Sequence, residues 1–265
     1  MTSEPNGEST HEIDLNCDAG ESYGHWPMGD DEALIPLMTS VSIACGAHAG
    51  DPLVMRRTLL LAKAHGVAVG AHPGFPDLHG FGRRMMPLSP DEVEAWTLAQ
   101  LGALAGVARG VGVTLHHVKP HGALYNAAAD DEALAGAIVR AVRAFDPALA
   151  LVARAGSRMV DVARRGGLGV AEEAFADRGY DGAGRLLPRS HPGALLRSPA
   201  EAAERAVTLL QTGDLVTGDG ASLRLRPQTL CVHSDTQGSV AIAAAVRAAL
   251  LAANVQLRPL YELAR

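Results

Sequence analysis

The sequence predicts an α/β fold, a single closed or nearly closed (β/α) barrel of seven to eight mostly parallel strands. Short apolar runs alternate with longer stretches of helical period along the 265 residues. The apolar runs are continuous rather than alternating, as in parallel strands that are covered on both faces. No linker rich in Gly, Ser or Pro divides the chain, so we expect one barrel domain at 12–265 after a flexible polar tail at 1–11.

The expected elements follow one another in a regular βα order. Strands are predicted at 13–17, 41–45, 67–71, 113–118, 149–153, 168–175 and 229–233. Helices are predicted at about 31–38, 52–65, 90–108, 131–144, 157–165, 199–211 and 237–252. Three helix starts carry capping signals: Ser89 and Glu92 fit a capping box, while Asp51 and Ser198 each precede a first-turn proline.

Two segments do not fit the βα repeat. The stretch 176–197 is too long for a routine connection and is expected to form a lid or a pocket wall. The stretch 214–227 is predicted to be a small hairpin that turns at 218–220, where Gly-Asp-Gly stands.

The composition is typical of a soluble globular protein, with 48% hydrophobic and 20% charged residues and a net charge of −6. The arginines form no basic stripe, so no nucleic-acid partner is expected. A polar, acidic start and the lack of a long uninterrupted apolar segment predict a cytoplasmic protein with no membrane partner. Cys17, Cys45 and Cys231 are far apart and form no C-x-x-C pair, so we expect reduced, buried thiols.

Polar side chains gather where the predicted strands end. Active sites of (β/α) barrels form at the carboxyl ends of the strands, so a polar pocket is expected there. The residues, in or just after the ends of these strands, are Asp14, Asn16 and Asp18 of the first, His48 of the second, His72 of the third, Lys119, His121 and Tyr125 of the fourth, Glu173 and Arg178 of the sixth, and His233 and Asp235 of the seventh. Such bases, cations and donors suit the addition of water to a carbonyl, which makes hydrolysis the leading reaction class.

Some of these residues also have plain structural interpretations. Asp51 and Asp235 suit helix caps equally well, and Asp14 and Asn16 are able to hold loop backbone. Lys119 stands out because Lys and Arg together number 23, and only Lys63 is a second lysine. A lysine in an arginine-rich chain indicates a place that needs a compact ammonium with three donors.

Several motifs together resemble the LamB/YcsF family, whose members are described as the A subunit of 5-oxoprolinase. They are "DLNCDAGESYG" (14–24), "SIACGAHAGDP" (42–52), "GAHPGFPDLHGFGRR" (70–84), "VKPHGALYN" (118–126), "EAFADRGY" (173–180) and "CVHSDT" (231–236), in order along the chain. Small departures from the family pattern at Ser42, Ala47, 74–75 and Ser234 affect the shape of the pocket rather than its charges.

The resemblance implies a fold similar to the barrels of glycoside hydrolases and deacetylases. It also implies the opening of 5-oxo-L-proline to L-glutamate, with hydrolysis of ATP to ADP and phosphate and with subunits B and C as partners. ATP is then a co-substrate. Neither lysine follows a glycine, so no G-x-x-x-x-G-K-[ST] loop is present, and nucleotide handling is expected to lie largely on the partner subunits.

The resemblance and the predicted pocket lead to a hypothesis for residue roles. Asp18 or His72 activates water, Lys119 and Arg178 bind the substrate carboxylate or phosphate, and His121 or His233 protonates the lactam nitrogen. The catalytic set is Asp14, Asn16, Asp18, His48, His72, His121 and His233, and the substrate-binding set is Lys119, Tyr125, Glu173, Arg178 and Asp235.

Two other functions fit the same residues. In a metal-dependent deacetylase or amidohydrolase, Asp18, His48 and His72 would bind a divalent ion. In a non-catalytic lactam-binding protein, the pocket would bind its ligand without turnover.

Overall fold

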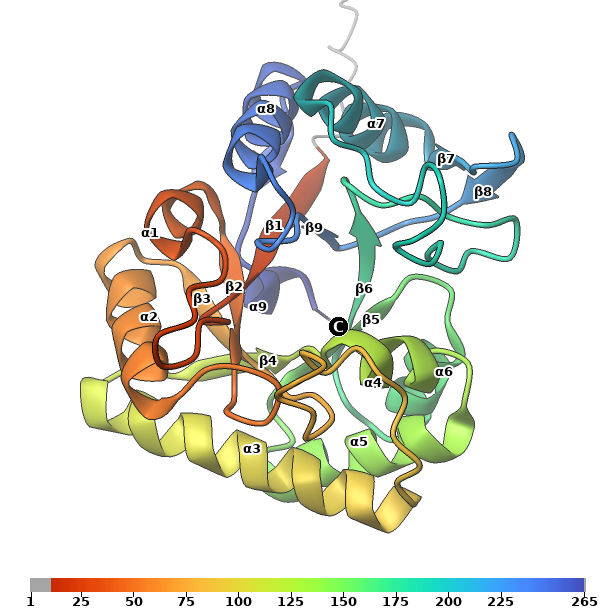
Figure 1. Cartoon of the computed structure of the whole chain (residues 1–265). Helices are drawn as coiled ribbons and strands as arrows, with labels where there is room; N and C mark the ends of the chain where they lie inside the picture. Colours follow the sequence, from red (N-terminus) through yellow and green to blue (C-terminus); the bar gives the residue numbers. More distant parts are fainter. Residues whose placement is uncertain (1–10, 265) are drawn as a thin grey trace, which may run out of the picture.

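The computed structural model describes residues 11–264 and shows a closed barrel of 7 parallel strands surrounded by helices (Figure 1). The strands are β1 (Glu12–Ala19), β2 (Ser40–Ala44), β3 (Ala68–His72), β4 (Leu115–Val118), β5 (Ala150–Arg154), β6 (Val170–Phe175) and β9 (Thr229–Cys231). They pair in chain order, and β9 closes the ring because it pairs in parallel with both β6 and β1. The predicted fold class is confirmed, as are all the predicted strands. The predicted tail at 1–11 lies almost wholly outside the described residues.

Every predicted helix is present on the outside of the barrel. The helices are α1 (Asp31–Leu34), the 3-10 helix η1 (Ile35–Leu37), α2 (Pro52–Ala64), α3 (Pro90–Val111), α4 (Gly122–Ala128), α5 (Glu132–Phe145), α6 (Arg158–Arg165), α7 (Pro199–Thr212), α8 (Ser239–Ala252) and α9 (Leu260–Leu263). The first predicted helix is divided because Pro36 has no backbone N–H to continue the α-helical pattern. None of the helices in 11–264 is both long and apolar enough to cross a membrane.

The capping signals fix the helix starts as predicted. Ser89 and Glu92 form a complete capping box, in which each side chain bonds the other residue's backbone N–H. Asp51 caps α2 by accepting hydrogen bonds from the N–H groups of Leu53 and Val54. These caps satisfy donors that the first helical turn leaves free. Asp51 is therefore a structural cap and not part of the pocket.

Three short elements were missed: α4, α9 and the two-residue strand β10 (Gln256–Leu257). The strand β10 pairs beside the start of β1, and α9 lies behind the ring of strands (Figure 1). Leu260 of α9 packs with Ala150, Val152 and Ala171 and covers the amino ends of the strands. Elements of this length show no periodicity, so their positions depend on tertiary packing.

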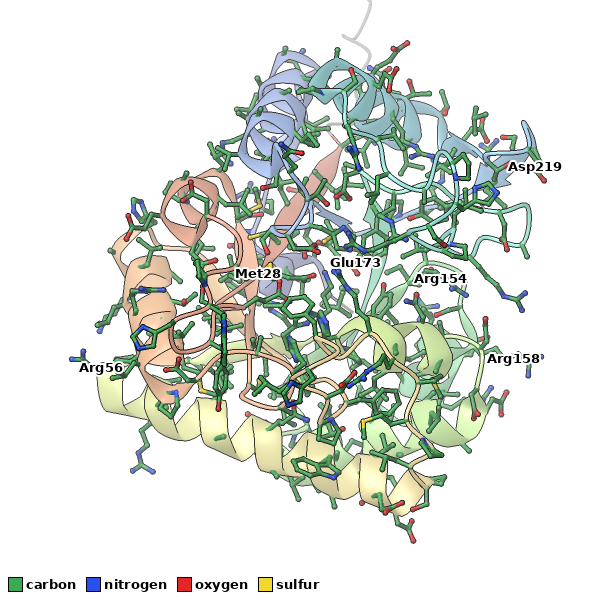
Figure 2. All side chains as sticks on the ribbon, viewed as in Figure 1. Met28, Arg56, Arg154, Arg158, Glu173 and Asp219 are labelled. Carbon is green, nitrogen blue, oxygen red and sulfur yellow. The ribbon has the colours of Figure 1, made fainter. Side chains whose placement is uncertain are left out.

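The two irregular segments have the predicted forms. The hairpin consists of β7 (Asp214–Val216) and β8 (Ser222–Arg224), which pair antiparallel, and Asp219 lies at its tip (Figure 2). The segment 176–197 folds back on itself through isolated bridges between Arg178 and Leu195 and between Tyr180 and Leu186. It covers one side of the barrel opening and is called the lid segment below. Cys17, Cys45 and Cys231 are buried and free, as predicted.

The base of the barrel interior contains a polar layer around Asp14, which is fully buried. Thr39 Oγ1 donates to Asp14 Oδ1 at 2.7 Å, and Thr229 Oγ1 donates to Asp14 Oδ2 at 2.6 Å. Burial raises the pKa of the Asp14 carboxyl to about 6, although the two threonine hydrogen bonds oppose it.

Asp14 is therefore expected to make stability depend on pH. Because its folded pKa is raised, its contribution to stability is present below about pH 4 and is lost as pH rises through about 6. Asp14→Asn removes this dependence. The free energy of unfolding of the variant, relative to the wild type, should rise between pH 4 and 7 by an amount on the order of 3 kcal/mol. Denaturant unfolding at several pH values measures this, and parallel curves for the two proteins would contradict it.

Candidate functional site

A cavity of about 420 Å³ opens at the carboxyl ends of the barrel strands. Side chains from the ends of β1, β3, β4, β6 and β9 line its base, and the lid segment supplies one wall. The prediction that the lid segment is a pocket wall is confirmed. Four cationic side chains line the cavity, namely Arg83, Lys119, Arg178 and Arg189. This excess of positive charge suits an anionic ligand.

Lys119 lies at the base of the cavity with its ammonium between two carboxylates. Its Nζ is 2.9 Å from Asp18 Oδ1 and 2.8 Å from Glu173 Oε1. It also donates to Asn16 Oδ1 and to Cys231 Sγ, each at 3.1 Å. The three residues Asp18, Lys119 and Glu173 are at most 6% exposed, and Glu173 is seen at the centre of the barrel (Figure 2).

The opposite charges of Asp18 and Lys119 hold both side chains in their ionised forms. Burial by itself raises the pKa of Asp18, but His72 and Lys119 outweigh it and hold that pKa well below its ordinary value. Burial lowers the pKa of Lys119, yet Asp18 and Glu173 more than compensate and raise it well above the usual value. Asp18 and Lys119 therefore remain a charged pair at neutral pH.

The second carboxylate is held by neutral donors. Asn16 Nδ2 donates to Glu173 Oε1 at 3.0 Å, and Tyr125 OH donates to Glu173 Oε2 at 2.8 Å. Burial raises the pKa of the Tyr125 hydroxyl well above its usual value, so it remains a donor. Glu173 thus has no free oxygen facing the cavity and does not line it.

His233 and Asp177 form a buried imidazole–carboxylate pair at the cavity wall. His233 Nδ1 is 3.0 Å from Asp177 Oδ1, and the His233 backbone N–H donates to Asp177 Oδ2 at 3.2 Å. The ring stacks on Phe175 with 5.2 Å between centroids. Because Asp177 accepts a hydrogen bond from the Nδ1–H group, Nε2 is the ring nitrogen left for proton transfer.

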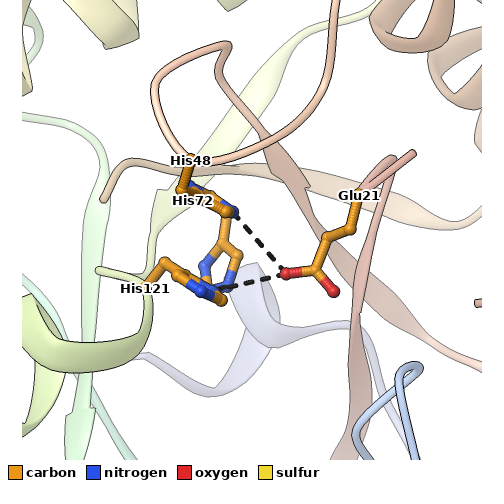
Figure 3. Close-up of side chains that lie close together, drawn as sticks. All are labelled: Glu21, His48, His72 and His121. Carbon is orange, nitrogen blue, oxygen red and sulfur yellow. Dashed lines mark hydrogen bonds and ion pairs between the residues drawn. The ribbon is translucent and has the colours of Figure 1, made fainter. Parts of the chain in front are cut away.

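Three imidazoles and one carboxylate meet beside the cavity (Figure 3). This imidazole cluster consists of Glu21, His48, His72 and His121, all buried. One N or O atom from each lies within 4.8 Å of the other three. Burial lowers the pKa of His48 and His121 well below the usual value, so both rings are neutral. Neutral imidazole and carboxylate are groups that bind metal ions.

Backbone carbonyls fix two rings of the imidazole cluster. His72 Nδ1 donates to the carbonyl oxygen of Lys119 at 2.6 Å, and His121 Nε2 donates to that of Phe81 at 2.8 Å. The remaining nitrogens, His72 Nε2 and His121 Nδ1, lie 2.9 Å apart. The His48 and His121 rings stack parallel, with 3.8 Å between centroids.

A ring of salt bridges shapes the rim of the cavity. Arg83 Nη2 and Arg189 Nη2 approach the two oxygens of Asp235 at 2.7 and 3.1 Å. Burial raises the pKa of Asp235, but Arg83 and Arg189 outweigh it and hold the pKa below its ordinary value. Arg178 donates to the carbonyl oxygens of Ala194 and Leu187, at 3.1 and 2.7 Å, and so fastens the lid segment.

The predicted site residues fall into three places. Those that line the cavity are Asp18, His72, Lys119, His121, Tyr125, Arg178 and His233. Those behind it are Asn16, Glu173 and His48, Asp235 lies at the rim between Arg83 and Arg189, and Asp14 lies deeper, at the polar base. The Asp18 carboxylate pairs with Lys119 and also lies 3.5 Å from His72 Nε2, whereas the four-residue group with His48 and His72 contains Glu21 and His121.

Four residues at the site had no predicted role: Glu21, Arg83, Asp177 and Arg189. Arg83 and Arg189 lie on long connections, where sequence gives no side-chain direction. Glu21 and Asp177 follow the ends of β1 and β6 by two residues each, and this spacing was the one available signal.

The comparisons with known proteins all indicate one family. The LamB/YcsF family model matches residues 13–265. The protein named as the 5-oxoprolinase A subunit of Chloroflexus aggregans is 54% identical over 93% of this chain and 98% of its own length. The protein of the same name from Syntrophobacter fumaroxidans is 51% identical over 92% of this chain and 96% of its own.

A solved structure also matches closely. The crystal structure of a lactam utilization protein from Thermus thermophilus is 50% identical, with a TM-score of 0.88. The match covers 93% of this chain and 99% of that chain. The motifs around the cavity, the family model and these relatives all agree: the chain belongs to the LamB/YcsF family.

Proposed function

We propose that this chain is the lactam-opening subunit of an ATP-dependent 5-oxoprolinase, which converts 5-oxo-L-proline to L-glutamate. The observation that carries the proposal is a cationic cavity with a buried imidazole–carboxylate pair, His233–Asp177, in its wall. The close relatives are named as a 5-oxoprolinase component and as a lactam utilization protein, and both names support the same substrate class.

The chemistry explains why ATP is needed. The lactam carbonyl is protected by amide resonance, and ring closure is entropically favoured because the reacting groups are held close. Phosphorylation of the lactam oxygen makes the carbon open to attack. Water then adds to it, the ring C–N bond breaks as the nitrogen takes a proton, and a second water hydrolyses the resulting acyl phosphate.

The anionic groups of the substrate are assigned to the arginines. Arg83, Arg178 and Arg189 line the cavity, and a guanidinium suits a carboxylate or phosphate through paired hydrogen bonds. The ammonium of Lys119 already contacts Asp18, Glu173 and other acceptors of the protein. Lys119 is therefore assigned a positioning role, which keeps Asp18 ionised and oriented, rather than direct substrate binding.

Proton transfer is assigned to His233. A ring nitrogen of His233 and a carboxylate oxygen of Asp18 lie within 4.8 Å of each other, a separation that one bridging water spans. Asp18 orients this water, His233 takes its proton and then delivers a proton to the ring nitrogen. Asp177 holds His233 in the required tautomer and stabilises its charged form.

Nucleotide handling is assigned mainly to subunits B and C. The chain contains no G-x-x-x-x-G-K-[ST] loop, whose backbone N–H groups would hold the phosphates of ATP. A cytoplasmic location is proposed with it, because ATP is the co-substrate and the three cysteines are free thiols.

Lys119 variants test the positioning role. Lys119→Arg should lose activity nearly as fully as Lys119→Ala, by at least about 100-fold, because the longer planar guanidinium does not fit between Asp18 and Glu173. Both should also lower Tm, since each disturbs a buried charge network. The matched control is Lys63→Arg, outside the cavity, with unchanged activity. Glutamate formation with subunits B and C is the measurement. Full activity of Lys119→Arg would contradict the positioning role of Lys119.

Two amide variants test the water-activating groups. Asp18→Asn and His233→Asn should each lower kcat by a factor of about 10² to 10⁴, because the first variant loses the carboxylate that orients the water and the second loses the ring nitrogen that takes its proton. Circular dichroism should show that both remain folded. If either variant keeps more than about a tenth of the wild-type kcat, that residue does not take part in water activation.

The purified chain alone should show little or no ATP hydrolysis dependent on 5-oxoproline. Adding subunits B and C should produce ADP and glutamate together, because phosphoryl activation makes the carbonyl open to attack. The two products are measured in the same reaction. Stoichiometric release of both by the isolated chain would contradict the proposed division of labour.

A further inference from the structure

We propose that the imidazole cluster, Glu21, His48, His72 and His121, binds one divalent first-row transition metal ion, with Zn²⁺ the best fit. This inference rests on the buried geometry of the cluster and does not depend on the reaction proposed above. It differs from the set expected from the sequence, because Glu21 supplies the carboxylate and His121 a third imidazole.

The hydrogen bonds of His72 and His121 to carbonyl oxygens leave no hydrogen atom between the two ring nitrogens that face each other. A carbonyl oxygen only accepts, so His72 Nδ1 and His121 Nε2 must both carry protons. Unless a further proton or a metal ion is present, His72 Nε2 and His121 Nδ1 then both present lone pairs, at a separation of 2.9 Å. Two facing lone pairs repel, so a positive species must lie between or beside them.

One extra proton would not satisfy the whole cluster. Within residues 11–264, Glu21 Oε1 and both ring nitrogens of His48 are buried without a hydrogen-bond partner. Glu21 Oε1 lies 3.3 Å from His121 Nδ1 and 3.6 Å from His48 Nε2 (Figure 3). A proton joins two of these atoms, whereas a metal ion joins one atom from each of the four residues.

The outer contacts resemble those that orient metal ligands. A histidine ligand usually donates its other ring N–H to a carbonyl or carboxylate, as His72 and His121 do. The second oxygen of Glu21 accepts a hydrogen bond from Ser234 Oγ at 3.1 Å. Gly82, with φ of +62°, lies against the cluster, and a Cβ there would come within 2.8 Å of both His48 and His121.

The ligand types select the metal. Three imidazole nitrogens and one carboxylate oxygen match the four-coordinate sites of Zn²⁺, while Mg²⁺ and Ca²⁺ prefer oxygen ligands throughout. Because the His48 and His121 rings stack parallel, one of them must tilt out of the stack before both nitrogens point at one ion. A metal-bound structure should show this tilt.

The first experiment measures metal content without turnover. The chain is expressed without a polyhistidine tag, purified without chelator and analysed by inductively coupled plasma mass spectrometry. About one equivalent of a transition metal per chain is expected. After the metal is stripped, Co²⁺ should restore binding and give the visible absorption of a four-coordinate site, and Zn²⁺ should raise Tm.

Variants then locate the site. His48→Ala and the isosteric Glu21→Gln should each lower Co²⁺ affinity by at least about 100-fold. The matched control His65→Ala, an exposed histidine at the end of α2, should bind as the wild type does. Asp18→Asn should lower affinity less than Glu21→Gln. Glu21→Gln keeps the shape of the side chain, so it remains informative if His48→Ala fails to fold.

Three results would overturn the proposal. They are a folded, stripped chain that neither binds Co²⁺ nor gains Tm from Zn²⁺, equal affinity of the wild type and Glu21→Gln, and a loss of binding in Asp18→Asn that exceeds the loss in Glu21→Gln. Each is a binding measurement, so it stands whether or not the chain opens a lactam.

Discussion

The buried ammonium of Lys119 is the charge on which the rest of the site depends. Removing such a group from water costs several kcal/mol unless opposite charges and acceptors meet it with good geometry. Three strands provide the partners of the ammonium: β1 supplies Asp18 and Asn16, β6 supplies Glu173 and β9 supplies Cys231. Any strand that shifted by one residue would turn its side chain to the other face and leave the ammonium short of partners.

The other buried polar groups of the barrel interior also need hydrogen-bond partners. Asn16 Nδ2 donates to both Glu173 and Thr229, and Thr229 donates in turn to Asp14. Inward-facing positions alternate along β1, so Asp14, Asn16 and Asp18 share one face of that strand. A polar interior is tolerated only when nearly every group is satisfied, and this chain of hydrogen bonds supplies the partners from the base to the cavity.

The barrel and its connections contribute different parts of the site. The charges at the base are carried by strands, whose backbone is fixed by pairing on both sides. The cations at the rim, Arg83 and Arg189, come from long connections and share Asp235 between them. A rigid base with adaptable loops above it is the usual arrangement of barrel enzymes, and it places reaction chemistry on the strands and ligand selection on the loops.

The sequence by itself determined the barrel strands, the longer helices and the location of the site. Continuous apolar runs identified the barrel strands, capping signals fixed the starts of α2, α3 and α7, and the polar residues after the strands identified the end of the barrel that holds the cavity. The scarcity of lysine marked Lys119 before any contact was known. These features are local, because propensity, capping and side-chain alternation act over a few residues.

Only the tertiary structure decided which polar residues meet. Asp18 was expected to join His48 and His72; its carboxylate lies 3.5 Å from His72 Nε2 but pairs mainly with Lys119, and Glu21 is the carboxylate that approaches His48 and His121. Lys119 was expected to bind substrate, yet its donors are directed to the protein. Some of these pairings join residues more than a hundred positions apart, as Lys119 and Asn16 do. They depend on the register and closure of the barrel, which no local pattern of residues encodes.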